Sequence, residues 1–303
     1  MAGVTGQERP ELRARVIVAA ADHGVAAAGV SAYPPEVTAQ MLATFASGRG
    51  AVSVLAREVG AELVCVDAGV RGDTTALGPA VVQTGLAPSR NLLEEPALSG
   101  EQLDGAMAAG RALAAAAAAD QITVLAIGEM GIANTTPATC LTAWMTGRAP
   151  GQLAGPGTGL DAAGVARKAR VVEGALALHS PSAPLDALRC VGGGEIALLC
   201  GVVLGAAEHG VGVVCDGLIA TAAAAVAAAV EPGVLPWLVA GHRSPEPAHS
   251  ALLEHLGLDP VLELGMRLGE ASGATAALAV LRLAIATHDG MATFAEAGVA
   301  GAS

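Results

Sequence analysis

Short apolar runs rich in β-branched residues constrain the fold of this chain more than any other feature. These runs are residues 15–21, 63–66, 122–127, 188–191, 211–215 and 234–239. None of them alternates with polar residues, which is typical of strands that are buried on both faces. Alanine-rich stretches of helical length, such as 101–119 and 195–207, separate most of the runs. The alternation predicts an α/β fold with a mostly parallel, Rossmann-like sheet flanked by helices.

Glycine or a polar side chain follows each apolar run. The run ends are Asp22-His23-Gly24, Asp67-Ala68-Gly69, Gly128-Glu129, Gly192-Gly193-Gly194-Glu195, Asp216-Gly217 and Gly241-His242. In an open parallel sheet such ends meet at one edge, outside which ligands bind. Glycine lets the backbone approach a ligand, and helix N-termini offer amides to a phosphate. The alternative is that glycine only ends strands and acids only cap helices. Recurrence after every run favours an enzyme with an anionic ligand at this edge.

The chain after Pro260 has a different pattern from the rest. Residues 261–268 and 273–286 both have helical character, without an intervening strand-like run. We therefore expect a large α/β domain over residues 10–257 and a small helical subdomain over 258–303.

Composition excludes several classes of function. The formal net charge of -12 argues against a sequence-independent nucleic-acid binder, which needs a basic surface. The polar N-terminus has no apolar signal core, and no stretch is apolar enough to span a membrane, so we expect a soluble cytoplasmic protein. The five cysteines have apolar flanks and no CxxC spacing, which favours buried thiols, and the seven histidines form no metal-binding pattern.

Two further stretches are open to opposite interpretations. The glycine-rich turn 155–161 precedes a helical stretch with Lys168, an arrangement typical of a phosphate cradle, but a flexible surface loop fits as well. Glu296 has apolar neighbours, including Phe294, that would raise the pKa of its carboxyl and make it a base near neutral pH. A charge on a frayed terminus is the alternative.

Eight motifs together resemble one family. They are ADHGVAAAGVSAYPPEVTAQM, GEMGIANTTPAT, GTGLD, GGGEIALLCGVVLGAA, DGLIATAAA, GHRSPEPAH, RLGEASGATAAL and MATFAEAGV. In this order, from about residue 16 to residue 299, they resemble the nicotinate-nucleotide:dimethylbenzimidazole phosphoribosyltransferases, which make the lower-ligand nucleotide of cobalamin. The resemblance implies transfer of phosphoribose from nicotinate mononucleotide to 5,6-dimethylbenzimidazole, with inversion at C1′. It also implies a homodimer, and no cofactor or metal.

The resemblance also implies roles for individual residues. Glu296 matches the family's catalytic base, and Glu129 would face the ribose or the developing positive charge. The expected phosphoribosyl contacts are Gly131, Asn134, Thr135, Lys168, Gly193, Gly194 and Ser244. The expected benzimidazole contacts are Ser31, Tyr33 and Gln40.

Two departures from the family pattern bear on activity. An N-terminal GSLGxLE element of the family is absent here, and Ala133 occupies a position that is usually glycine. A positive φ at Ala133 would carry a strain cost. A non-catalytic paralogue that binds an azole or a nucleotide, as a sensor or carrier, is therefore the alternative to the transferase.

Overall fold

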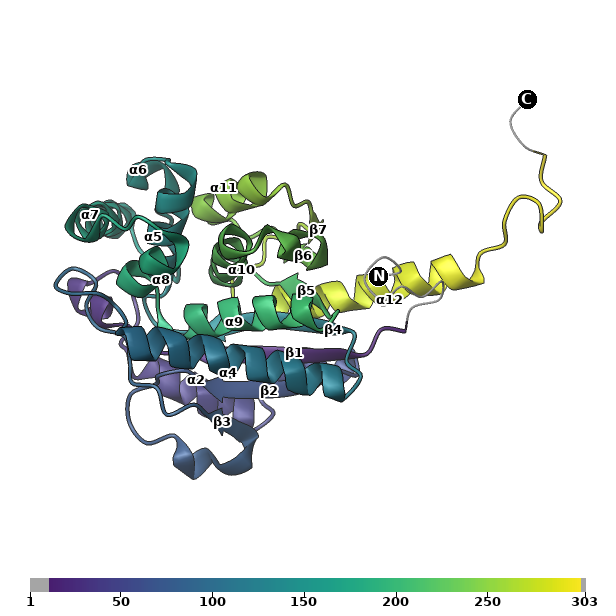
Figure 1. Cartoon of the computed structure of the whole chain (residues 1–303), viewed down its shortest axis with the longest axis horizontal. Helices are drawn as coiled ribbons and strands as arrows, with labels where there is room; N and C mark the ends of the chain where they lie inside the picture. The colour runs from purple at the N-terminus through teal and green to yellow at the C-terminus, as the bar shows by residue number, and fades with distance from the viewer. Residues whose placement is uncertain (1–10, 301–303) are drawn as a thin grey trace.

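A seven-stranded parallel sheet forms the centre of the molecule (Figure 1). The computed structural model describes residues 11–300. The strand order is β3-β2-β1-β4-β5-β6-β7, and every neighbouring pair is parallel. The strands are β1 (Ala14–Ala20), β2 (Glu62–Asp67), β3 (Val81–Gln83), β4 (Val124–Met130), β5 (Gly212–Cys215), β6 (Leu238–His242) and β7 (Pro260–Leu262). The predicted Rossmann-like α/β class is therefore confirmed, with the doubly wound order of that fold.

The expected strands are confirmed at four of the six runs, where β1, β2, β4 and β5 form. The strand expected at 188–191 is wrong, because these residues end helix α8 (Pro184–Val191). Proline at the first helical position favours this helix, and a short apolar run does not distinguish a strand from a helix turn. The run 234–239 is mostly a 3-10 turn, η3 (Pro232–Trp237), and β6 begins only at Leu238.

Each face of the sheet has its own set of helices, because successive side chains of a strand point to opposite faces. Ile17 and Ala19 face the larger core, whereas Val16 and Val18 face the smaller one. Around the larger core lie α4 (Gly100–Ala119), α5 (Thr135–Thr146), α6 (Pro150–Leu153), α7 (Ala162–His179), α8, α9 (Gly194–Glu208), α10 (Leu218–Val230) and α11 (Pro247–Leu256). Around the smaller core lie α2 (Val37–Ala46), α3 (Ala51–Glu58) and the first turns of α12 (Ser272–Gly290). Two further 3-10 turns, η1 (Gly24–Ala28) and η2 (Thr75–Ala80), follow β1 and β2.

Close helix packing explains why the chain is rich in glycine and alanine but poor in aromatic residues. Helices α4 and α9 lie side by side across the sheet (Figure 1). A Cβ at Gly110 would lie 2.0 Å from the carbonyl oxygen of Leu198, and one at Gly201 would lie 2.2 Å from that of Met107. Small residues therefore bring the two helix backbones into direct contact.

The C-terminal part departs from the expected pair of helices. The helix expected at 261–268 is wrong: Pro260–Leu262 is strand β7 of the main sheet, followed by an irregular segment. Positive φ angles at Gly265, Gly269, Glu270 and Ala271 are incompatible with a continuous helix here. The helix expected at 273–286 is confirmed within α12, whose second half and the chain after it extend away from the sheet (Figure 1). A separate subdomain over 258–303 stays a prediction.

Candidate active site

The candidate site lies at the carboxyl edge of the sheet, where polar side chains gather as expected. Asp22, Glu129, Asp216 and His242 follow or end β1, β4, β5 and β6, and all four are buried. The strand order reverses between β1 and β4, which is the position where open α/β sheets bind ligands.

Two adjoining pockets open at this edge. The inner pocket has a volume of about 90 Å³ and is bounded by the strand ends and by the starts of α5 and α10. Its wall includes Glu129, Asn134, Thr135, Gly217, Leu218, His242, Ser244 and Glu246. The outer pocket, of about 570 Å³, is mainly apolar and includes Tyr33, Val37, Met41, Met130, Leu268 and Glu270. Met130, Ile132, Gly157, Thr158, Arg267 and Leu268 line both. A compact compartment with several polar side chains in its wall therefore adjoins a wider compartment that can hold a planar apolar ring.

Glu129 stands at the end of β4 in the wall of the inner pocket. Its side chain accepts a hydrogen bond from Asn134 Nδ2, so two of the predicted site residues meet here. Burial, with 7% of the residue exposed, raises the pKa of Glu129 to about 8, and the negative charges of Glu195, Asp216 and Glu270 contribute to that rise. The residue is therefore mainly protonated at neutral pH.

The backbone of Ala133 is in the left-handed conformation, with φ of 74°. This is the conformation expected at a position that is usually glycine in the family. An L-residue there carries a strain of about 1–2 kcal/mol, whereas its buried methyl contributes about 0.8 kcal/mol. Ala133→Gly is expected to stabilise the fold by up to about 1 kcal/mol, since relief of strain exceeds the lost burial. Urea denaturation of the two proteins measures this difference, and a destabilised glycine variant would show that the methyl contributes more than the strain costs.

Lys168 is fully buried, although it lies on the expected basic helix α7. Its Nζ donates to Thr135 Oγ1 at 3.0 Å and to the carbonyl oxygen of Gly155 at 2.9 Å. Burial lowers the pKa of Lys168, and the negative charge of Glu246 opposes that shift. The ammonium therefore joins the start of α5 to the glycine-rich loop.

Glu246 fixes the same glycine-rich loop from the other side. Its Oε1 accepts the backbone N–H of Gly157 at 2.8 Å, while within residues 11–300 its buried Oε2 has no hydrogen-bond partner. Sequence reasoning missed this residue, although it lies in the quoted GHRSPEPAH motif.

Glu270 is the principal site residue that sequence reasoning missed. It precedes α12 with φ of 62°, and its backbone N–H donates to the carbonyl oxygen of Glu129 at 3.2 Å. It lines the outer pocket, where burial raises the pKa of its carboxyl to about 7, with the charge of Asp216 as a second cause. The signal was available in the motif RLGEASG, which places an acid between glycines.

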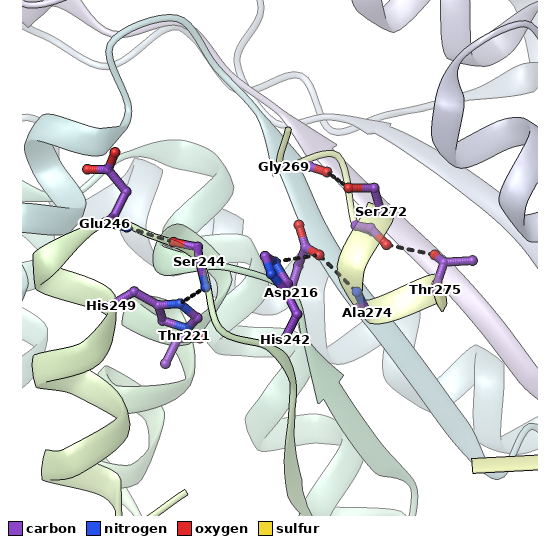
Figure 2. A network of polar contacts seen from close by, with 11 residues as sticks. Asp216, Thr221, His242, Ser244, Glu246, His249, Gly269, Ser272, Ala274 and Thr275 are labelled. Atoms are coloured by element: carbon purple, nitrogen blue, oxygen red, sulfur yellow. Dashed lines mark hydrogen bonds and ion pairs between the residues drawn. The ribbon is translucent and has the colours of Figure 1, made fainter. Parts of the chain in front are cut away.

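A polar network beneath the inner pocket connects β5, β6, α11 and α12 (Figure 2). The backbone N–H of Ser244 donates to His249 Nδ1 at 3.0 Å, and His249 Nε2 lies 3.0 Å from Thr221 Oγ1. Burial lowers the pKa of His249 to about 3, so this ring is neutral and holds Ser244 in the pocket wall. Ser244 therefore lines the inner pocket, and its contact with a phosphoribosyl group stays a prediction.

The structure does not bring Glu296 to either pocket. Glu296 is exposed on the segment that follows α12, and this segment extends away from the sheet (Figure 1). The carboxylate accepts hydrogen bonds from the backbone N–H and Oγ1 of Thr293, which lower its pKa. The expectation that apolar neighbours raise this pKa is therefore wrong, because Phe294 is itself 66% exposed.

Of the other residues predicted to contact a substrate, some line a pocket and others do not. Gly131 and Tyr33 line pockets, whereas Ser31 accepts a hydrogen bond from the backbone of Tyr33 and Gln40 is exposed on α2 outside both linings. Gly193 and Gly194 line neither pocket. Instead they pack so closely that a Cβ would lie 2.3 Å from the His23 ring and 2.1 Å from the carbonyl oxygen of Ala68, respectively.

Within residues 11–300, no group of three or more histidine, cysteine or acidic side chains is placed to hold a metal ion. In the same range no helix combines the length and the apolar character needed to cross a membrane.

Comparison with known proteins identifies relatives over nearly the whole chain. A family described as "Phosphoribosyltransferase" matches residues 1–299. This chain belongs to that family. The nicotinate-nucleotide--dimethylbenzimidazole phosphoribosyltransferase of Xanthomonas axonopodis pv. citri (strain 306) is 51% identical over 298 residues, which cover 97% of this chain and 85% of the relative. The protein of the same name from Chloroflexus aurantiacus (strain ATCC 29366 / DSM 635 / J-10-fl) is 49% identical, covering 99% and 86%.

A solved structure of the phosphoribosyltransferase family also matches the fold. CobT from Thermus thermophilus superposes with a TM-score of 0.93 at 42% identity, covering 99% of this chain and 91% of that one. The strand-edge site described above therefore lies within a family fold that is shared over nearly all of the chain.

The raised carboxyl pKa values give this phosphoribosyltransferase an unusual pH dependence of stability. The folded state keeps the Glu129 proton up to about pH 8, whereas an unfolded glutamate loses it near the ordinary value of 4.5. Stability is therefore lost as the pH rises through this window, by on the order of a few kcal/mol at about 1.4 kcal/mol per pKa unit. Glu129→Gln, which is neutral throughout, is expected to flatten the fall in melting temperature between pH 5 and pH 8.5. Calorimetry without ligand tests this, and parallel curves for the two proteins would contradict it.

Proposed function

We propose that this chain transfers phosphoribose from nicotinate mononucleotide to 5,6-dimethylbenzimidazole, giving α-ribazole 5′-phosphate and nicotinate. The curated relatives carry the name of this activity at 51% and 49% identity. In the reaction one benzimidazole nitrogen bonds to C1′ while the C1′–N bond to nicotinate breaks. The attack comes from the opposite face, which inverts the anomeric centre. The other benzimidazole nitrogen then gives up its proton.

The observation that carries this proposal is the convergence of two helix N-termini on the inner pocket. Asn134 and Gly217 stand at the N-cap positions of α5 and α10 and line the inner pocket, and within residues 11–300 the Asn134 side chain does not cap its helix. The positive ends of two helix dipoles favour a phosphate there. Lys168 adds a cation behind Thr135, the first residue of α5.

The outer pocket supplies a site for the azole and a base beside it. Tyr33, Val37 and Met41 provide apolar surface for the benzimidazole ring. Glu270 faces the same space, and a pKa of about 7 is well matched to proton abstraction near neutral pH. We therefore assign the role of general base to Glu270, and the sequence-based prediction for Glu296 becomes the competing assignment.

Glu129 opposes the positive charge of the nucleotide in this proposal. The nicotinate ring nitrogen is cationic until its bond to C1′ breaks, and the ribosyl centre becomes cationic as it does. Either charge within the inner pocket favours the ionised form of Glu129. The carboxylate thus forms when the nucleotide binds, and it stabilises the cationic transition state.

A homodimer remains our proposal for the assembly. Leu283, Met291, Phe294 and Val299 are exposed apolar side chains on α12 and the segment after it. A second copy that packs on this segment would cover them. Sedimentation equilibrium tests the dimer.

The assay that tests the function follows release of nicotinate from nicotinate mononucleotide in the presence of dimethylbenzimidazole. Turnover with α-ribazole 5′-phosphate as product supports the transferase. Saturable binding of the azole without any turnover would instead establish the alternative, a non-catalytic paralogue that senses or carries its ligand.

A further inference from the structure

Arg267 lies on the irregular segment of residues 263–271, the rim segment, which joins β7 to α12. Near the end of this segment, the carbonyl oxygen of Gly269 accepts a hydrogen bond from Ser272 Oγ at 2.7 Å (Figure 2). A Cβ at Gly269 would lie 2.9 Å from Glu129 Oε1, so the backbone of the rim segment packs directly against that carboxyl group. Arg267 precedes this contact, lines both pockets and is exposed, so a ligand can reach its side chain.

Arg267 is the only lysine or arginine among the residues that line the two pockets. Lys168 lines neither of them, because its side chain is fully buried. The same linings contain three acidic residues, Glu129, Glu246 and Glu270. Within residues 11–300, the Arg267 side chain forms no ion pair with any of these acids and makes no hydrogen bond. The guanidinium group is therefore free to bind an anion where the two pockets adjoin.

The donor of the proposed reaction carries two separate anionic groups. The first is its phosphate, which the two helix N-termini of the inner pocket favour. The second is the carboxylate of the nicotinate ring, whose nitrogen is positively charged. A site for this zwitterionic ring needs an acidic group for the nitrogen and a basic group for the carboxylate. Glu129 supplies the first in our proposal, and Arg267 supplies the second from the rim segment beside it.

A guanidinium group suits this role for a geometric reason. Its planar fork of N–H donors binds both oxygens of a carboxylate, and it remains charged throughout the physiological pH range. A carboxamide in the same place has no charge, and its NH2 group faces a partner that has no acceptor. The Arg267 side chain therefore favours an acid over the corresponding amide.

We infer that Arg267 determines the specificity for the donor: its guanidinium group binds the carboxylate of the nicotinate ring and selects nicotinate mononucleotide over nicotinamide mononucleotide. The inference rests on the proposed transfer reaction, but it holds whichever glutamate is the base. The contact is made in the bound donor and again in the released nicotinate. Because it binds substrate and product alike, it acts on KM for the donor and not on kcat.

The test compares Arg267→Gln with the parent protein on both donors, at saturating dimethylbenzimidazole. For nicotinate mononucleotide we expect KM to rise roughly 10- to 100-fold, the range for loss of a charge-assisted hydrogen bond, with kcat within a few-fold of the parent value. For nicotinamide mononucleotide we expect little change, because that ring has no carboxylate. Arg267→Lys keeps the charge but loses the fork, so its KM should lie between the two. An equal loss on both donors would overturn the inference.

Arg282→Gln is the matched control, because it makes the same chemical change on α12. The Arg282 side chain bonds to the carbonyl oxygen of Gly60 and lines neither pocket. We expect this variant to react with both donors as the parent protein does. If it lost the preference for the acid as Arg267→Gln does, the effect would belong to the net charge of the protein, and the inference would be wrong.

Calorimetric titration with free nicotinate and with nicotinamide measures the same contact without turnover. We expect the parent protein to bind nicotinate more tightly, and Arg267→Gln to bind the two compounds equally. Equal binding of the two compounds by the parent protein would contradict the inference. A parent protein that prefers nicotinate through Arg267, but releases none from the mononucleotide, would instead contradict the proposed function and support the contact. The two failures are therefore distinguishable.

Discussion

Glu270→Gln is expected to lower kcat by roughly 10²- to 10⁴-fold while nucleotide and azole still bind, because a positioned general base contributes about that much. Glutamine preserves the size of the side chain and its backbone bond to the carbonyl oxygen of Glu129. It cannot accept the benzimidazole proton. Stopped assays of nicotinate release, with both KM values determined, separate this loss from a loss of binding.

Glu296→Gln is the control for that experiment, because it makes the same chemical change on an exposed segment. With Glu270 as base, the rate of Glu296→Gln stays within a few-fold of the parent rate. The reverse result, with Glu296→Gln inactive and Glu270→Gln active, would return the base to Glu296.

The pH profile gives an independent check on the same residue. The base must be ionised, so kcat/KM for dimethylbenzimidazole, measured at saturating nucleotide so that Glu129 is already ionised, is expected to rise with pH through about 7, the pKa of Glu270. An exposed carboxylate with a lowered pKa, such as that of Glu296, would place this limb below pH 4.5, its ordinary value. A flat profile between pH 6 and pH 8 would therefore exclude Glu270.

The sheet was predictable because its central strands are buried on both faces and read as unbroken apolar runs. The edge strands were not, since Val81–Gln83 and Pro260–Leu262 are three residues each and only partly buried. The run at 188–191 contains Arg189, and Pro184 together with the Asp186–Arg189 pair favours a helix, which a strand-sized window does not reveal.

The sequence predicted the site residues that follow strands, but not those whose position depends on the local backbone conformation. Glu129 follows an apolar run, so its place at the sheet edge follows from topology. Glu270 reaches the same edge only because two left-handed residues turn the chain before α12, and no spacing rule predicts that turn. Apolar neighbours in the sequence suggested that Glu296 is buried, but those neighbours are themselves exposed. Burial depends on tertiary contacts, which local composition does not report.

Lys168→Met is expected to raise the apparent KM for nicotinate mononucleotide by roughly 10- to 100-fold, because a charge-assisted hydrogen bond contributes about 1.5–3 kcal/mol. Methionine fills much of the space of the buried lysine stem, so the variant tests the ammonium and not the packing. It also leaves Thr135 Oγ1 and the carbonyl oxygen of Gly155 without their donor. We therefore expect a lower melting temperature, which binding of the mononucleotide restores less well than in the parent protein.

The substrate dependence of this variant decides what Lys168 does. If the ammonium supports the phosphate at the start of α5, the KM for dimethylbenzimidazole changes little. A truncated donor, nicotinate riboside, should then react equally slowly with both proteins, because it carries no phosphate for Lys168 to hold. Arg167→Met, on the same helix, is the matched control: its side chain is exposed and bonds to the carbonyl oxygen of Gly29, outside both pockets. An effect of Lys168→Met confined to the azole would contradict the phosphate role and would place the ammonium with the acceptor instead.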